Sequence, residues 1–447
     1  MNATARADAI VADRLRLAAA REPVPGRATG DSAAEIAASL AAASPHAERF
    51  TAEIAAAVRG TALALDAAQP HPADLWAAAA AAHRDPSVWF EQAVLLGHPV
   101  HPLARSRGEW TDDQIRAWAP EHRSRFDLGA YAVEGLDGTG RDDPRRRLPV
   151  HPWQARRYGL GEPDFTWAAA PLMSVRTVSI GPSHIKTAVD LQLTSAVRHV
   201  SAAAAANGPV LSERLAPVAA KHGITLLPEY AIWARSADGT PLAHLSAIVR
   251  TAPHLLGHPR AVPLAALAEP CPATGRPIAA TLAGNDLESW WPALVHVALA
   301  PLRLYAATGV ALEAHGQNTL ASFTGDTPTG LVYRDFGGIR VPPAQWPHIV
   351  GDLPEPDPEA RLTKLLAALL PTTMTAIVTA LADWTDTEPA QWWSVVASDV
   401  RGQGLPAEIA DAVLREPWPL KATTAMRLAD HPTDDLWIRV DNPLAAR

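Results

Sequence analysis

Two stretches of the chain carry residues suited to holding a metal ion. The first supplies a carboxylate, an imidazole and two amides, from Glu313, His315, Gln317 and Asn318. The second supplies another carboxylate, Asp335, directly after Arg334. Carboxylate and amide oxygens are hard ligands of the kind that Mg²⁺ prefers beside phosphate oxygens, and His315 can donate a hydrogen bond to such an oxygen. A polar turn between a helix and a strand explains the same residues equally well.

A group of cations and hydroxyls between residues 174 and 198 is a candidate binding site for a polyanion. Its members are Ser174, Arg176, Thr177, Lys186, Thr194 and Arg198. On a strand, Ser174 and Arg176 share one face and Thr177 points to the other. An i, i+4 spacing on a helix points Thr194 and Arg198 the same way. If the cations converge with only Asp190 as a nearby acid, they repel one another unless a polyanion binds. The alternative is a solvated face on which the charges lie apart.

Lysine is rare in this chain, which has 39 Lys and Arg residues but only four lysines. In such a background a retained lysine indicates a need for a compact point charge. This favours a functional role for Lys186 and Lys421, whereas Lys221 and Lys364 resemble ordinary solvated positions.

Two His-Pro segments form a further candidate. In residues 97–102, His98 and His101 are each followed by a proline, and the two prolines disfavour a metal-binding helical turn. We therefore expect these imidazoles to donate hydrogen bonds within a rigid loop that presents Arg105 and Arg107 to an anion. Two interpretations of residues 148–154 remain: a buried turn packed by Trp153, or a segment that contacts a ligand directly.

Composition excludes several classes of protein. A net charge of −8, without a basic patch interleaved with aromatic residues, argues against a nucleic-acid partner. The single cysteine, Cys271, excludes an intrachain disulfide and a multi-cysteine zinc site. We expect no secretory signal, no membrane partner and a cytoplasmic location. No Walker A loop, G-x-G-x-x-G turn or G-x-S-x-G elbow positions a ligand, so a nucleotide would be bound by side chains.

At 447 residues, the chain is long enough for two or three domains. Apolar residues that recur at every fourth position predict amphipathic helices over residues 1 to about 90. Short β-branched runs predict antiparallel strands at 175–180, 231–234 and 247–250, with a helix from about Asp190 to Ala206. A Pro-rich segment at 258–278 indicates a domain boundary. The remainder reads as mainly helical, with a strand pair at Thr319–Phe323 and Gly330–Asp335.

Cations on one side and hard-oxygen ligands on the other fit a nucleoside triphosphate with Mg²⁺. The residues by themselves therefore predict an ATP-using enzyme without a P-loop, and the reaction does not follow from their spacing. In addition, the chain resembles the IucA/IucC family of NRPS-independent siderophore (NIS) synthetases. The matching motifs, in family order, are Gly97–Pro102, His151–Gln154, Ser174-x-Arg176-Thr177, Lys186, Thr194–Arg198, Glu313–Asn318, Arg334-Asp335, Leu420–Ala422 and Met426–Leu428.

This resemblance implies an α+β, hand-like fold with an antiparallel sheet in the fingers, a mainly helical palm and a reduced N-terminal thumb. The implied divisions are thumb 1–145, fingers 146–260 and palm 261–447. ATP would bind between fingers and palm. The enzyme, expected as a homodimer, would adenylate a carboxylate of citrate or a related polycarboxylic acid and release pyrophosphate. An amine, hydroxylamine or alcohol would then displace AMP.

The resemblance also implies roles for single residues. The triphosphate would be held by Ser174, Arg176, Thr177 and Lys186. Charge at the α-phosphorus would be stabilised by Lys186, while Arg198, with Thr194 beside it, would bridge the α-phosphate and the substrate carboxylate. Phosphate or carboxylate contacts are implied for His315, and a nucleotide contact for Asn318. The Mg²⁺ ligands would be Glu313, Asp335 and Gln317. Lys421 would reach the pocket of the second substrate.

Two departures from the family pattern concern the side of the acceptor. Arg105 stands where the family usually has Lys, and Glu109-Trp110 replaces a Gly-Phe pair. An adenylating ligase that makes a non-siderophore product is the enzyme alternative. A non-catalytic protein that binds a carboxylate or iron is the alternative from another class.

Overall fold

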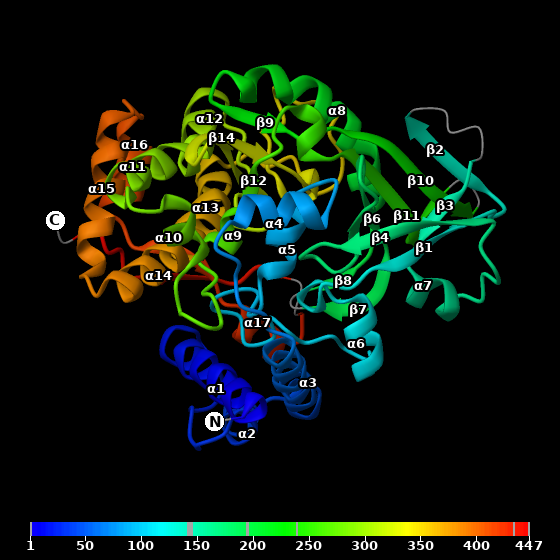
Figure 1. Ribbon diagram of the computed structural model, residues 1–447, viewed down its shortest axis with the longest axis horizontal. Coiled ribbons are helices and arrows are strands. Elements are labelled where there is room, and N and C mark those ends of the chain that lie inside the picture. Colours follow the sequence, from blue (N-terminus) through cyan, green and yellow to red (C-terminus); the bar gives the residue numbers. More distant parts are fainter. Residues whose placement is uncertain (1, 141–145, 194–195, 238–239, 432–433, 446–447) are drawn as a thin grey trace.

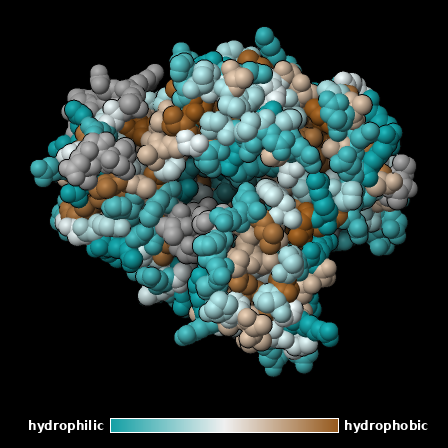
Figure 2. Space-filling model, turned by 180° about the vertical axis from the view of Figure 1, so that it is seen from behind, coloured by the Kyte–Doolittle hydropathy of each residue, from teal (hydrophilic) through white to brown (hydrophobic). Residues whose placement is uncertain are grey.

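A computed structural model describes residues 2–140, 146–193, 196–237, 240–431 and 434–445. The fold is α+β. N-terminal helices, a large antiparallel sheet and a mainly helical C-terminal half occupy separate regions, in the expected hand-like arrangement (Figure 1). Seen from behind, the molecule is hollowed near its centre, and mainly hydrophilic residues border the hollow (Figure 2).

Three packed helices begin the N-terminal region: α1 (Ala3–Arg21), α2 (Ala33–Ala41) and α3 (Ala47–Asp66). The predicted apolar spacing is confirmed, because Ile36, Leu40, Phe50 and Ile54 are buried in one cluster. Shorter elements lead from these helices to the large sheet: α4 (Leu75–Ala82), α5 (Ser87–Ala93), α6 (Asp112–Trp118) and the 3₁₀ turn η1 (Pro120–His122).

Eight antiparallel strands form the large sheet, in the order β2-β10-β11-β6-β5-β4-β1-β3. Their bounds are β1 (Phe126–Tyr131), β2 (Leu136–Gly140), β3 (Leu148–Val150), β4 (Phe165–Pro171), β5 (Thr177–Ser179), β6 (Ser183–Thr187), β10 (Glu229–Ala237) and β11 (Thr240–Thr251), and α7 (Pro152–Arg157) follows β3. The three predicted strands are confirmed as β5, β10 and β11. Because β1 and β2 both belong to this sheet, its strands begin at Phe126, before the expected boundary at residue 145.

The helix predicted from Asp190 to Ala206 is wrong in its first part. There β7 (Val189–Leu193) and β8 (Ala196–Arg198) pair as a two-stranded sheet, and α8 (Ala202–Ala220) begins only afterwards. Residues 189–193 alternate apolar and polar side chains, which is the period of a strand, and this pattern outweighs the helical spacing.

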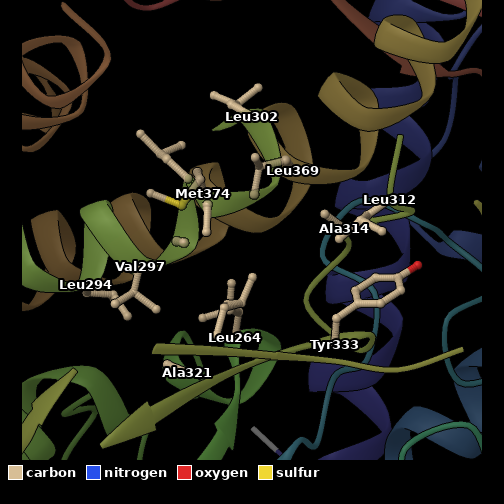
Figure 3. Close-up of a cluster of buried hydrophobic side chains, with 14 of the residues drawn as sticks. Leu264, Leu294, Val297, Leu302, Leu312, Ala314, Ala321, Tyr333, Leu369 and Met374 are labelled. Atoms are coloured by element: carbon tan, nitrogen blue, oxygen red, sulfur yellow. The ribbon is translucent and has the colours of Figure 1, made fainter. Parts of the chain in front are cut away.

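A second sheet has the order β12-β13-β14-β9, with β9 parallel to β14. Its strands are β9 (Ile224–Leu226), β12 (Ala261–Pro263), β13 (Thr319–Thr324) and β14 (Thr327–Tyr333). The predicted strand pair is therefore confirmed as β13 and β14. The largest buried cluster joins this sheet to the surrounding helices, and Leu312, Ala314 and Tyr333 belong to it (Figure 3). Burial of Leu312 and Ala314 anchors the segment that carries Glu313.

Helices make up most of the C-terminal half. They are α9 (Leu264–Leu267), α10 (Ile278–Ala283), α11 (Leu287–Ala298), α12 (Ala300–Thr308), α13 (Pro358–Ala368), the π-helical turn η4 (Leu369–Met374), α14 (Thr375–Thr385), α15 (Pro389–Gly402), α16 (Ala407–Leu414) and α17 (Thr423–Leu428). Two 3₁₀ turns, η2 (Pro253–Leu256) and η3 (Phe336–Gly338), and the strand pair β15 (Trp418–Lys421) and β16 (Trp437–Val440) complete the described elements.

The continuous helical segment Pro358–Thr385 is long and apolar enough to cross a membrane. However, 72% of its most apolar window is buried inside the protein. Leu365, Leu369 and Leu381 belong to the largest buried cluster, as expected of a core helix.

The N-terminal helices are joined to the C-terminal segment by polar contacts. Glu22 accepts hydrogen bonds from the backbone N–H groups of Thr424 and Ala425, both at 2.8 Å. Arg427 forms an ion pair with Glu53 of α3. The thumb helices therefore help to fix α17, which directly follows the strand bearing Lys421.

Candidate active site

A buried ion pair joins the large sheet to the C-terminal half. Lys186, on β6, donates through Nζ to Oδ1 of Asp335 at 2.6 Å. Asp335 follows β14 and has a φ of 71°, a backbone conformation that is strained for a residue other than glycine. Such strain concentrates at functional sites, and here it directs a carboxylate from one sheet onto a lysine of another.

The register of the large sheet gathers further site residues on the face that bears Lys186. Thr177 of β5 pairs with Lys186, and Arg250 of β11 pairs with His184, two residues before Lys186. Glu229 of β10 pairs in turn with Arg250. Side chains that face each other across antiparallel strands, and those two apart along a strand, share one face. The sheet therefore presents Thr177, Lys186, Arg250 and Glu229 together.

Arg250 and Glu229 were missed in the sequence. Among the described residues, Nε and Nη1 of Arg250 and Oε1 of Glu229 are buried without a hydrogen-bond partner. Burial lowers the pKa of Arg250 to about 10, with Arg334 adding to this effect and Asp335 opposing it. Burial raises the pKa of Glu229 to about 7, which nearby Lys186 opposes. Only the strand register, which is not visible in the sequence, reveals their place in the site.

The charges around Lys186 and Asp335 are strongly coupled. Burial by itself would raise the pKa of Asp335, but Lys186 and Arg250 hold it well below its usual range. Burial lowers the pKa of Lys186, and the charge of Asp335 opposes this effect. Arg176 adds a third cation that acts on both groups. The convergence of cations predicted from the sequence is therefore found for Arg176 and Lys186.

The turn before β5 has a different geometry from the strand that we expected. Val175 has a φ of 68°, which is rare for a β-branched residue. As a result, the Ser174 hydroxyl contacts Thr177 Oγ1 at 2.7 Å, so the expectation that Ser174 and Thr177 point apart is wrong. Arg176 is buried, and its Nη1 donates to the His199 carbonyl at 2.5 Å.

A tyrosine hydroxyl links the two segments predicted to hold Mg²⁺. Tyr333 accepts from the backbone N–H of Glu313 and donates to the backbone carbonyl of Asp335, each at 3.2 Å. The Glu313 carboxylate lies against Gly338, where a Cβ atom would be 1.8 Å from Oε2. A larger residue at this position would displace the Glu313 carboxylate. Both carboxylates therefore flank the turn η3.

The donor set at this turn suits Mg²⁺ in chemical type. Two carboxylates are what this ion takes from a protein when phosphate oxygens and water complete its shell. No cluster of three or more His, Cys, Asp or Glu side chains with the geometry of a metal site occurs in the described ranges. Glu313 and Asp335 therefore fit Mg²⁺ only when a bound phosphate supplies further oxygens.

The remaining palm residues shape the loop between α12 and β13. Asn318 donates through Nδ2 to the Glu313 carbonyl at 3.4 Å, and the Gln317 carbonyl accepts from Arg334. The backbone N–H of His315 donates to the Glu313 carbonyl at 2.9 Å. The loop is thus held by its own polar groups, as expected of a polar turn. It also carries the Glu313 carboxylate, which is a predicted Mg²⁺ ligand.

Two predicted site residues cannot be placed in full. Thr194 lies outside the described residues. Arg198 pairs with Val189 through its backbone in β8, and its side chain is not described. The expected helix face shared by Thr194 and Arg198 is wrong, because Arg198 lies on a strand.

The loop after residue 97 does not present its arginines to an outside anion. Arg105 and Arg107 are buried, and both bind Glu121, which is also buried. Nδ1 of His101 accepts from the backbone N–H of Leu103 at 3.0 Å, rather than donating within the loop. The anion that the two arginines bind is therefore a carboxylate of the same chain.

The second His-Pro segment forms a buried turn. His151 caps α7 by accepting from the Trp153 backbone N–H at 3.2 Å, and its ring stacks on Trp110 at 5.5 Å. Gln154 accepts from the backbone N–H of Asp190 at 2.8 Å and so holds the start of β7. This segment supports the β7–β8 hairpin.

Lys364 and Lys421 lie beside the same carboxylate, Asp435, and Lys364 is close enough to Glu313 to feel its charge. Lys421 pairs with Asp435 at 2.6 Å, and Lys364 lies 4.0 Å from the same carboxylate. Burial lowers the pKa of Lys364, with Glu313 opposing this effect. The prediction that Lys364 is an ordinary solvated residue is therefore wrong. The helix α13, which orients it, gives no distinctive motif in the sequence.

Comparison with known proteins finds two family matches. A model of the IucA / IucC family matches residues 87–136 and 134–269. A model described as a ferric iron reductase FhuF-like transporter matches residues 288–435. The first covers most of the large sheet, and the second covers the helical half.

Individual proteins agree with these matches. Staphyloferrin A synthase of Staphylococcus aureus is 25% identical over 435 residues, covering 80% of this chain and 73% of that protein. Aerobactin synthase of Escherichia coli is 27% identical over 331 residues, covering 58% of this chain and 57% of that protein.

The fold is also found in a solved structure. ATP-bound aerobactin synthetase IucA from a hypervirulent pathotype of Klebsiella pneumoniae superposes with a TM-score of 0.76 at 21% identity. That superposition covers 93% of this chain and 88% of the other. The ordered motifs, the family match, the relatives and the shared fold agree, so the resemblance of this chain to the IucA/IucC family is confirmed.

Proposed function

We propose that this protein is an ATP-dependent ligase of siderophore biosynthesis. It adenylates one carboxylate of citrate or a related polycarboxylic acid and condenses it with an amine, a hydroxylamine or an alcohol, releasing AMP and pyrophosphate. The family and the siderophore synthases among its relatives support the reaction class. The neighbour solved with ATP supports the choice of nucleotide.

The single observation that carries this proposal is the buried Lys186–Asp335 pair. Arg176 and Arg250 are close enough to Asp335 to lower its pKa, so the three cations Lys186, Arg176 and Arg250 face two carboxyl groups there, Asp335 and Glu229. Such an excess of buried positive charge is costly unless an anion binds. A triphosphate has the charge to compensate it, and its Mg²⁺ would be drawn to the carboxylates.

In the first step, an oxygen of the substrate carboxylate attacks the α-phosphorus of ATP. A bond forms between these two atoms, the bond from the α-phosphorus to the bridging oxygen breaks, and pyrophosphate leaves. Negative charge grows on the α-phosphate oxygens, and the Lys186 ammonium and the Arg176 guanidinium stabilise it. Before ATP binds, Asp335 neutralises Lys186. ATP binding frees Lys186 to contact the phosphate.

In the second step, the nitrogen or oxygen of the nucleophile attacks the acyl carbon. The bond from this carbon to the AMP oxygen breaks, AMP leaves, and the nucleophile loses its proton to water. His315 and Arg198 are assigned to the carboxylate and α-phosphate, and Lys421 to the pocket of the second substrate. Lys364, which lies beside Lys421, adds a second cation to this pocket.

Glu313 and Asp335, with Gln317 near them, would hold Mg²⁺. When bound, the ion neutralises part of the triphosphate charge and so helps pyrophosphate to leave. We assign the binding of the phosphate groups to Ser174, Arg176, Thr177 and Lys186. Thr194 is assigned a place beside Arg198, and Asn318 a contact with the nucleotide. A homodimer, a cytoplasmic location and the absence of membrane and nucleic-acid partners complete the proposal. The division into thumb 1–145, fingers 146–260 and palm 261–447 belongs to it as well.

The test is release of pyrophosphate from ATP with a panel of citrate, a succinyl-diamine and 2-oxoglutarate. Pyrophosphate that depends on a carboxylate is expected, and mass spectrometry of the product with a panel of amines then identifies the acceptor. Release of inorganic phosphate would indicate an acyl-phosphate ligase. Binding of a carboxylate or Fe(III) without turnover would favour the non-catalytic alternative.

A further inference from the structure

A second concave site lies away from the active site, where the second sheet meets the helices α11 and α12. It is a cavity of about 280 Å³ at the start of β9 and in the middle of β14. These two strands are paired, as Figure 1 shows. The residues lining the cavity are Lys221, His222, Gly223, His296, Val297, Ala300, Arg303, Thr329 and Gly330. We refer to this cavity as the basic pocket.

Cationic and imidazole side chains dominate the basic pocket. Lys221 and His222 lie just after α8, while His296 lies on α11 and Arg303 on α12. No acidic residue is among the residues that line the cavity. Four nitrogen-bearing side chains from three segments of the chain therefore meet at one hollow.

Part of this charge is left without a partner. Within the described part of the chain, Lys221 and Arg303 form no ion pair, and Nη1 of Arg303 is buried without a hydrogen-bond partner. Asp399 contacts His296 at 3.0 Å and has a favourable electrostatic interaction with Arg303. One carboxylate thus faces two cations and two imidazoles.

The other nitrogen of the Arg303 guanidinium fixes its orientation. Nη2 donates to the backbone carbonyl of His296 at 3.0 Å, which holds the planar group at the wall of the pocket. Burial, together with the positive charges of Arg303 and Lys221, lowers the pKa of His222. A bound anion would relieve this repulsion, and a guanidinium with a free N–H is well suited to a carboxylate or phosphate oxygen.

The basic pocket is separate from the active site. Gly330 lines the pocket, and Asp335 follows five residues later along the chain. β14 runs on from Gly330 to its end at Tyr333, and at about 3.3 Å per residue this part of the strand is roughly 10 Å long. Neither Lys186 nor Asp335 is among the residues that line the pocket.

We propose that the basic pocket binds a small oxyanion with two or more negative charges, either a di- or tricarboxylate or pyrophosphate. The volume is slightly below that of typical small-molecule sites, which suits a ligand of this size. Lys221 and Arg303 exceed the one carboxylate nearby, Asp399, and donors from three segments of the chain suit a ligand that carries several anionic oxygens. This proposal does not depend on the reaction catalysed at the active site.

Calorimetric titration of the full chain with citrate and, separately, with pyrophosphate tests the proposal, in the absence of ATP and Mg²⁺. At least one of the two is expected to bind, and acetate, a monoanion, is expected not to bind. Arg303→Gln is expected to weaken this binding by about tenfold or more, because charge-assisted hydrogen bonds are lost. Lys221→Gln changes an exposed side chain, so it keeps the test valid if Arg303→Gln fails to fold.

Two further variants separate the sites. Lys186→Ala should leave binding in the basic pocket intact, whereas binding at the active site would be weakened by it. Arg415→Gln removes an exposed arginine of α16 and should have no effect. The proposal is wrong if neither Arg303→Gln nor Lys221→Gln weakens the binding of either anion, or if neither anion binds the Lys186→Ala protein. Citrate is a polycarboxylate and pyrophosphate is a phosphate compound, so the one that binds more tightly identifies the class of ligand.

Discussion

Replacement of Lys186 by methionine tests the role of the buried pair. Methionine keeps most of the volume of the side chain and removes its charge. Asp335 then lies in the interior without the partner that now contacts it at 2.6 Å. Both stability and turnover should fall, for different physical reasons.

The size of each effect follows from the surroundings. Removing one partner of a buried ion pair costs about 3–5 kcal/mol of folding free energy. Arg250 and Arg176 remain near Asp335 after the change, so the expected loss is at the lower end, about 3 kcal/mol. A lost group that stabilises transition-state charge costs about 2–4 kcal/mol, which is about a 30- to 1,000-fold loss in kcat.

The double variant Lys186→Met/Asp335→Asn separates the two effects. It removes the uncompensated carboxylate, so the free energy of unfolding, measured by denaturant titration, should recover most of its loss. The rate of carboxylate-dependent pyrophosphate release should stay low. Arg415→Met, an exposed change of similar chemistry, should alter neither quantity. A Lys186→Met enzyme with a rate near that of the parent would refute the assigned role.

Four further predictions concern other groups. His315→Ala should lower kcat by about 30- to 1,000-fold with Tm unchanged, because a donor to the reacting groups is lost; steady-state kinetics and thermal melts measure this. Tyr333→Phe deletes the hydroxyl that links the two carboxylate segments, so a titration should show half-maximal activity at a higher Mg²⁺ concentration. Burial raises the pKa of Glu229 from 4.5 to about 7, so its contribution to stability is complete below pH 4.5 and lost as pH rises through 7; calorimetry should show a smaller fall in Tm from about pH 5 to 8 in Glu229→Gln. Glu121→Gln removes the carboxylate that both Arg105 and Arg107 bind, so denaturant titration should show a loss of about 3–5 kcal/mol.

A specific result would refute each of these four predictions. Normal turnover in His315→Ala would remove that residue from the reaction. An unchanged Mg²⁺ requirement in Tyr333→Phe would mean that the hydroxyl does not position the metal ligands. Parallel pH profiles of Tm for Glu229→Gln and its parent would show that this carboxyl titrates normally. A stable Glu121→Gln protein would show that another group balances the arginines.

Elements whose apolar residues recur at a regular spacing could be predicted from the sequence, whereas elements that depend on strand pairing could not. Apolar residues at every fourth position predict the helix that contains Phe50 and Ile54, and β-branched runs predict β5, β10 and β11. The hairpin of β7 and β8 was read as a helix, although residues 189–193 alternate with a period of two. Alanine-rich sequence after this segment favours a helix locally, and it masked the short strand pattern.

For the site, the residue types that bind anions or metals could be identified, but their neighbours could not. Lys186 and Asp335 were predicted as members of separate groups, and the structure brings them into contact. Arg250 and Glu229 enter the site through strand register alone. Arg105 and Arg107 looked like anion ligands, and they are, but their anion is Glu121, which only the folded chain brings near.

The most direct test of the proposed reaction is ³¹P NMR of ATP incubated with the protein, Mg²⁺ and citrate, with and without an amine. AMP and pyrophosphate are expected in equal amounts, formed only when a carboxylate substrate is present and lost in Lys186→Met. Formation of ADP and inorganic phosphate, or no turnover with any polycarboxylic acid, would contradict the proposed reaction.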